Sequence, residues 1–189
     1  MKTLTIALAL ATTACLCVPA MAQDTAATTG MMTASDVGVA PLTGTSATDY
    51  VKMAADSDNY ETQASKLALS KSKDAGIKAY AKEMIADHGQ TSKALMAALK
   101  NGDRTITAPG MTLSAENANN IALLKGAPKG SFDALFVQQQ ITAHQKAWAL
   151  HKGYATDGTD PALKQVASTA VPIVEGHLSH VKTLAPAAS

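Results

Sequence analysis

The amino-acid sequence predicts an all-α protein whose main part is a four-helix bundle, and three observations carry that prediction. Hydrophobic residues make up 47% of the 189 residues, but aromatic residues only 4%. The apolar content therefore comes mostly from Ala, Leu, Val, Ile and Met, which favours helices over sheets. Four segments of about 25 residues carry apolar side chains at helical spacing. Such helices bury their apolar faces against one another, so a bundle is the expected architecture.

The first 22 residues have the layout of a secretory signal peptide. Lys2 precedes an apolar run over residues 4–18, and an A-x-A sequence ends at Ala22. This pattern is typical of a leader that is cleaved, here after Ala22. The run is shorter than the ~20 residues that span a membrane, and no later segment is long and apolar enough. We therefore expect an exported protein of the periplasm without a transmembrane segment.

Both cysteines of the chain, Cys15 and Cys17, lie inside this leader. The mature chain would then contain no thiol, no disulfide and no cysteine nucleophile. A lipoprotein leader, in which a cysteine becomes the first mature residue, is the alternative. It is disfavoured because Leu16 is too large for the position before Cys17, and the residues before Cys15 lack the expected leucine.

The segment that follows the leader, residues 23–47, is rich in Ala, Thr, Ser, Gly and Met and carries almost no charge. It shows neither the spacing of a strand nor that of a helix, so we expect a flexible, low-complexity tether. The four-helix bundle domain is then expected over residues 48–186.

The first two predicted helices cover residues 48–72 and 74–101. Thr48 or Ser46 can cap the first helix, Asp74 can cap the second, and Gly102 ends it. The apolar stripes consist of Met53, Tyr60, Ala64, Leu67 and Ala68 in the first helix, and of Ile77, Tyr80, Ala81, Met84, Ile85, His88, Leu95 and Leu99 in the second. The tight turn between the two helices makes them antiparallel neighbours.

A connector over residues 102–130 follows, and it contains a short predicted helix over residues 114–125 that Ser114 can cap. Ser131 is expected to cap the third long helix and Asp160 the fourth, in which Pro161 stands at the first position. Pro172 lies inside the fourth helix and is expected to kink it. The connector is long enough to cross the whole bundle, so a ferritin-type crossover and an up-down-up-down order both stay open.

The chain resembles an exported bacterial family, "domain of unknown function 4142". The resemblance rests on the order of DYVKMAA at 49–55, KLAL at 66–69, IKAYA at 77–81, MIADH at 84–88, SAE at 114–116, His144, and Pro172 followed by His177-Leu178. It implies a ferritin-like four-helix bundle with a long connector carrying a short extra helix between helices 2 and 3. No activity is established for the family. Gln63 and Ala143 depart from the acidic residues that members often carry there.

Four polar residues fall on the expected apolar faces, one on each long helix: Glu61, His88, His144 and His177. A carboxylate and three imidazoles facing a bundle interior can bind a transition-metal ion. The alternative is a buried network of hydrogen bonds. No histidine has an acidic residue three positions before it, so the Glu-x-x-His pairs of di-iron bundles are missing and ferroxidase chemistry is not expected.

Helical rise predicts which of these groups meet. Counted from the tight turn between their helices, the positions of Glu61 and His88 along the bundle axis differ by about 4–5 Å, so the two side chains can touch. His144 and His177 differ by about 7 Å, more than one turn, unless the kink changes the offset. Asp87 points about 100° away from His88, so we expect it to face solvent or a lysine.

The sequence contains no motif that is typical of the other function classes considered. The formal net charge is +1, and there is no basic helix with interleaved aromatics, so nucleic acid is not an expected partner. Glycine-rich phosphate loops, G-x-S-x-G and H-E-x-x-H are all missing. The sequence therefore favours a non-catalytic binding or envelope-associated protein without a cofactor. The alternatives are a metal-binding protein that uses the Glu/His cluster and, by analogy only, a protein associated with the outer membrane; the partner stays unknown.

Overall fold

The structure is a computed structural model that describes residues 31–100 and 105–185. The chain divides into two compact units, Met1–Gly30 and Met31–Ser189, and all described residues belong to the second. The expected signal peptide, its cleavage after Ala22, the first part of the tether and the stop at Gly102 lie outside the described residues.

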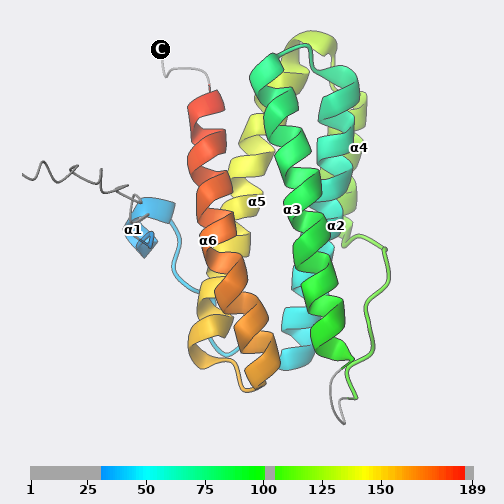
Figure 1. The fold of residues 1–189 in the computed structure, drawn as a ribbon. Helices are drawn as coiled ribbons and strands as arrows, with labels where there is room; N and C mark the ends of the chain where they lie inside the picture. The colour runs from blue at the N-terminus through cyan, green and yellow to red at the C-terminus, as the bar shows by residue number, and fades with distance from the viewer. Residues whose placement is uncertain (1–30, 101–104, 186–189) are drawn as a thin grey trace, which may run out of the picture. The chain divides into compact units, whose positions relative to one another are not determined.

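The described residues form six helices and no strand, which confirms the predicted all-α class (Figure 1). The helices are α1 (Ala34–Val37), α2 (Ala47–Lys71), α3 (Ala75–Leu99), α4 (Ala115–Gly126), α5 (Lys129–Asp157) and α6 (Pro161–Leu184). Among them, none combines the length and apolarity that a membrane-spanning helix needs. The four long helices α2, α3, α5 and α6 pack side by side as a bundle.

The order of contacts between the long helices settles the connectivity. Tyr50 near the start of α2 contacts His151 of α5, whereas Tyr60 further along contacts Gln139, so α2 and α5 are antiparallel. Asp87 of α3 contacts His177 of α6, whereas the earlier Glu83 contacts the later His180, so α3 and α6 are antiparallel too. Because α2–α3 and α5–α6 are joined by tight turns, α3 and α5 run in the same direction. The connector with α4 therefore crosses the length of the bundle, as in ferritin-type folds.

Capping side chains mark the N-terminal ends of most helices at the residues that the sequence predicts. Ser46 accepts a hydrogen bond from the Asp49 amide at the start of α2, and Asp74, Ser114 and Asp160 cap α3, α4 and α6. The start of α5 differs, because the helix begins at Lys129 and the Ser131 hydroxyl donates to the Pro128 carbonyl instead of capping. Helix α6 continues as one helix through Pro172.

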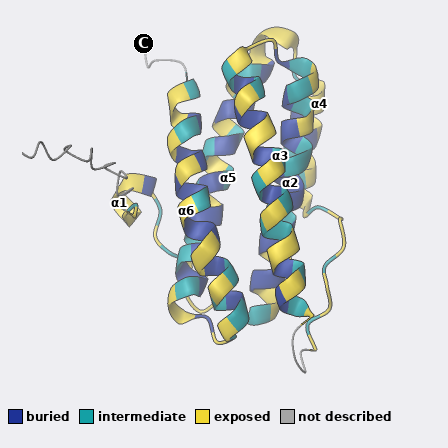
Figure 2. Cartoon of the chain, viewed as in Figure 1, coloured by how far each residue is buried: buried dark blue, intermediate teal, exposed yellow. Residues whose placement is uncertain are grey.

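The core lies between the four long helices and continues toward α4 (Figure 2). Tyr80 and Met84 are buried in it, as their place in the apolar stripe of the second predicted helix indicates. Met53 is an exception, because it is 43% exposed. The buried face of α2 instead passes through Tyr50, which leaves Met53 at the edge of the bundle.

The described part of the expected tether, residues 31–46, lies against α5 and α6. The Gln145 side chain donates to the Val37 carbonyl over 2.7 Å, and the Leu42 amide donates to the Ala149 carbonyl over 2.8 Å. Gly153 allows this close approach, since a Cβ there would lie 1.9 Å from the Leu42 oxygen. This segment, which we call the strap (residues 31–46), is thus part of the bundle unit.

Candidate metal centre

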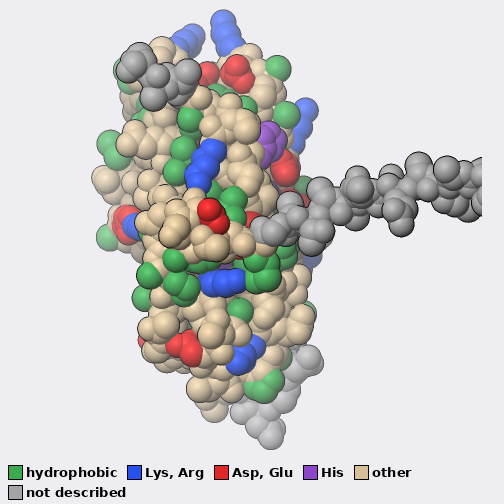
Figure 3. Space-filling view, turned by 90° about the vertical axis from the view of Figure 1, so that its left-hand side faces the viewer, with side chains coloured by type: hydrophobic (Ala, Val, Ile, Leu, Met, Phe, Trp, Pro, Cys, Tyr) green, Lys and Arg blue, Asp and Glu red, His purple; other side chains and the backbone are tan. Residues whose placement is uncertain are grey.

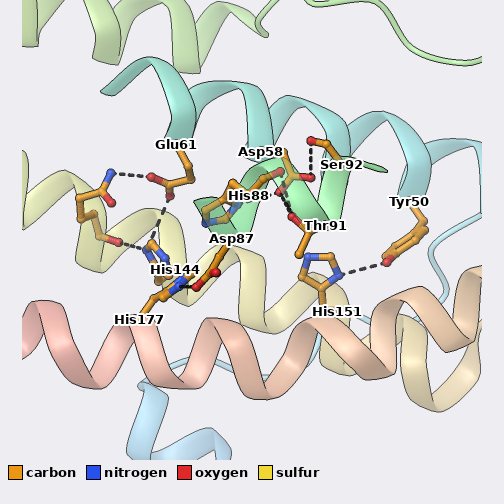
Figure 4. Close-up of polar contacts among 11 residues, drawn as sticks. Tyr50, Asp58, Glu61, Asp87, His88, Thr91, Ser92, His144, His151 and His177 are labelled. Carbon is orange, nitrogen blue, oxygen red and sulfur yellow. Dashed lines mark hydrogen bonds and ion pairs between the residues drawn. The ribbon is translucent and has the colours of Figure 1, made fainter. Parts of the chain in front are cut away.

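Three buried histidines from three helices meet in the middle of the bundle (Figure 4). His88 comes from α3, His144 from α5 and His177 from α6. The ring centroids are 5.9 Å apart for His88 and His144, and 5.4 Å apart for each pair that includes His177. One ring nitrogen from each residue can be chosen so that all three lie within 4.8 Å of one another. We call this group the histidine triad.

Each ring of the triad uses one nitrogen to hold its orientation. His88 Nδ1 donates to Asp58 over 2.7 Å, His144 Nδ1 donates to the Gln140 carbonyl over 2.8 Å, and His177 Nε2 donates to Asp87 over 2.9 Å. The other nitrogens, Nε2 of His88, Nε2 of His144 and Nδ1 of His177, are buried without a hydrogen-bond partner among the described residues. Histidines that ligate metals typically donate their second N–H to a carboxylate or carbonyl in this manner.

Glu61 lies next to the triad and is also buried. Its Oε2 accepts a hydrogen bond from the Gln140 side chain, and its Oε1 lies 3.6 Å from His144 Nδ1. Burial raises the pKa of Glu61 to about 7, against the opposing effect of His88 and Gln140. The Glu61 carboxylate therefore faces the nitrogen of His144 that is already engaged, and it is not one of the three convergent groups.

Burial and mutual repulsion decide the charge of the triad. Burial lowers the pKa of His144 well below its usual value, and nearby His88 and His177 lower it further. Burial also lowers the pKa of His177, although Asp87 partly opposes it. For His88 the effect of burial is outweighed by Asp58, so that its pKa is raised. At neutral pH the rings of His144 and His177 are thus neutral, which is the form that binds metals.

Sequence reasoning missed Asp58, whose carboxylate organises one side of the site. It is buried on α2 and accepts hydrogen bonds from His88 and from the hydroxyls of Thr91 and Ser92, at 2.7 Å, 2.9 Å and 2.9 Å. Its position three residues before Glu61 puts both on one helix face. This spacing could have indicated that Asp58 faces the bundle interior. An aspartate is seldom buried, however, so its side chain is usually expected to face solvent.

The sequence reasoning about Asp87 was right only in part. Its side chain is 36% exposed, as an orientation toward solvent implies, yet its Oδ2 also accepts the hydrogen bond from His177 Nε2. The 100° rotation from His88 directs Asp87 toward the adjacent helix α6. The ring centroids of His144 and His177 lie 5.4 Å apart, so the offset of about 7 Å that was expected along the bundle does not keep the two rings from meeting.

Two further histidines lie outside the triad. His151 is buried on α5, and its Nδ1 lies 3.1 Å from the Tyr50 hydroxyl. His180 on α6 is partly exposed, and its Nδ1 lies 2.8 Å from Glu83 of α3. Neither ring is part of the triad, so a substitution of either histidine leaves the three candidate ligands in place.

A protein-family model described as "Domain of unknown function (DUF4142)" matches residues 31–184, which include the strap and the whole bundle. No curated protein matches the chain. No solved structure matches it either.

Proposed function

The chain belongs to the family described as a domain of unknown function, DUF4142, and we propose that it is an exported protein that binds one transition-metal ion. The ligands are the free ring nitrogens of His88, His144 and His177. The observation that carries the proposal has two parts: each ring has one buried, unpartnered nitrogen while its other nitrogen is held, and the three residues offer ring nitrogens within 4.8 Å of one another.

Leaving three such nitrogens buried without partners is costly for a protein. Each unsatisfied buried polar group destabilises the folded state by about 1–3 kcal/mol. A structure that needed only packing would place apolar side chains here, since a half-satisfied polar network is worse than an apolar core. Metal coordination satisfies all three nitrogens at once.

The chemistry of the ligands selects the class of ion. Neutral imidazoles suit Zn²⁺, Cu²⁺, Ni²⁺ and Fe²⁺ rather than Mg²⁺ or Ca²⁺, which prefer oxygen. A tetrahedral Zn²⁺ with bonds of about 2.0–2.1 Å holds its ligand nitrogens about 3.4 Å apart. The triad nitrogens lie within 4.8 Å of one another, so small side-chain rotations close them on an ion. Since the triad is buried, the site takes a small ion rather than an organic substrate.

The test is metal analysis of mature protein purified without a histidine tag, because a tag binds the same ions. Metal-free protein is exposed to one equivalent of Co²⁺ or Zn²⁺, freed of excess ion, and analysed for metal content and for cobalt d–d absorption. We expect one ion per chain in the wild type, and near-complete loss in both His88→Ala and His144→Ala. His180→Ala, which removes a partly exposed histidine, is the matched control and keeps the ion.

The same experiment contains the outcomes that contradict the proposal. A wild-type protein that retains no ion supports the buried polar network that the sequence favours. Retention by His144→Ala and by the milder His144→Gln, each with the circular dichroism of the wild type, shows that the ion binds elsewhere.

Export of the protein is part of the proposal and is supported by the leader. The charged start, apolar run and A-x-A site predict that the mature chain begins at Gln23. N-terminal sequencing of the protein from a periplasmic fraction checks this. A chain recovered from the cytoplasm with its leader intact contradicts it.

A further inference from the structure

His177 belongs to two groups of metal-binding side chains at once. On one side it joins His88 and His144 in the triad, and on the other it joins Glu83 and Asp87 of α3 in a group whose ligand atoms also lie within 4.8 Å of one another. Its Nε2 donates to Asp87, while its Nδ1 is the buried, unpartnered nitrogen. The two nitrogens of one imidazole therefore connect the two groups.

Exposure to solvent changes stepwise along this connection. The side chains of Glu83 and Asp87 are 42% and 36% exposed, whereas that of His177 is 2% exposed. Histidine and acidic side chains lie next to each other on the face that carries α6 (Figure 3). In the close-up, Asp87 reaches His177 from α3, beside the buried rings (Figure 4). A path of ligand groups thus leads from solvent to the triad.

We propose that Glu83, Asp87 and His177 form an entry site that captures a divalent transition-metal ion from solution and passes it to the buried triad. This inference rests on the proposed function, since it concerns how the same ion reaches its site. We call Glu83 and Asp87, together with the Nε2 side of His177, the entry group.

The chemistry of the two groups supports transfer in this direction. Exposed carboxylates attract cations and raise their local concentration, but solvent and salt screen them, so they hold an ion weakly. Three desolvated imidazoles bind a transition-metal ion more strongly than two carboxylates do. When the ion displaces the Nε2 proton of His177, that proton leaves to solvent. The ion then moves to the Nδ1 side of the same ring and to Nε2 of His88 and His144, and Nε2 of His177 takes a proton back from solvent.

The test compares the rate of metal uptake with the final amount bound. Metal-free mature protein is mixed with Co²⁺ in a stopped-flow instrument, and the cobalt absorption is followed in the wild type and in Glu83→Gln. We expect Glu83→Gln to slow uptake by at least about tenfold, the lower end of electrostatic effects on association rates. Release to a chelator slows by the same factor, so the plateau of one ion per chain is unchanged.

Two further variants sharpen the comparison. Glu116→Gln is the matched control, because Glu116 is an exposed carboxylate that pairs with Lys146 away from the entry group, and its uptake rate equals that of the wild type. Asp87→Asn slows uptake too, but it also weakens equilibrium binding, since Asp87 orients His177.

Each result bears on the inference separately from the proposed function. Uptake by Glu83→Gln at the wild-type rate overturns the entry site and leaves the triad in place. A lower plateau in Glu83→Gln also overturns it, because Glu83 would then be a ligand of the stored ion. A wild-type protein that takes up no Co²⁺ or Zn²⁺ overturns both.

Discussion

Asp58 of α2 holds the ring of His88 across the α2–α3 interface, with 2.7 Å between Oδ1 and Nδ1. Both side chains are buried. The hydroxyls of Thr91 and Ser92 donate to the same carboxylate and fix its position. When the ring of His88 is neutral, this hydrogen bond places the proton on Nδ1 and the lone pair on Nε2, which makes Nε2 the nitrogen that is available to an ion.

The first prediction is that Asp58→Asn weakens metal binding by about 10–100-fold, the usual effect of removing a carboxylate that orients a ligating histidine. The uncharged amide also ends the contribution of Asp58 to the raised pKa of His88, so that this pKa falls. Competition with a chromophoric chelator measures the affinity, and NMR titration of the metal-free protein measures the pKa.

Asp56→Asn is the control for this prediction. Asp56 lies on the same helix, but its carboxylate accepts from the Ser114 amide and the Asn117 side chain on the side of α4. The control variant is expected to bind metal as the wild type does. Equal losses in both variants would attribute the effect to α2 stability rather than to the orientation of His88.

The second prediction is that metal binding stabilises the fold through the triad. An ion that binds only the native state adds about 4 kcal/mol to the free energy of unfolding when its concentration is 1,000 times Kd. Urea titrations with Zn²⁺ and with a chelator measure this difference in the wild type. In His144→Ala the two titrations coincide, and a zinc-dependent shift of wild-type size in this variant would exclude the triad as the source.

Local sequence patterns were sufficient to predict most of the fold. The capping residues Ser46, Asp74 and Ser114 start their helices as expected, because a cap acts within one turn. The crossover was left open, since connector length permits two topologies and only contacts such as Asp87–His177 decide between them. The strap was missed because its hydrogen bonds join residues that are far apart in the sequence, such as Gln145 and Val37, and leave no periodic pattern.

The same limit applies to the candidate site. Helical spacing was enough to select His88, His144 and His177, which the structure brings together. Glu61 was selected with them and lies next to His144, but outside the convergent group. Asp58 was missed because the groups that satisfy its carboxylate come mostly from another helix, and a single sequence does not show which faces meet.

The third prediction concerns His151 and the pH dependence of stability. Burial lowers the pKa of His151 from 6.5 to about 4, and nearby His88 adds to this effect while Asp58 opposes it. In the folded protein the ring stays neutral and shares a hydrogen bond with the Tyr50 hydroxyl, whereas in the unfolded chain it gains a proton below pH 6.5. Stability is therefore complete above pH 6.5 and falls by up to about 3 kcal/mol as the pH drops toward 4.

Urea titrations of metal-free protein between pH 7.5 and pH 4 measure this dependence. Other buried histidines contribute to the total, so the comparison with His151→Gln isolates the contribution of His151. The variant is expected to lose less stability over this range than the wild type, because glutamine has no proton to gain. Parallel pH profiles for the two proteins would show that His151 is not buried in its neutral form.

The fourth prediction compares two glycines inside long helices. Gly→Ala in a helix interior usually stabilises a protein by roughly 0.5–1 kcal/mol, and Gly176→Ala in α6 should do so because its Cβ meets nothing within 4 Å. Gly153→Ala in α5 should instead destabilise by about 1–3 kcal/mol, since its Cβ would lie 1.9 Å from the Leu42 oxygen and push the strap away. Urea titrations give the signs, and limited proteolysis detects release of the strap. A stabilised Gly153→Ala variant would mean that the strap does not pack on α5 in solution.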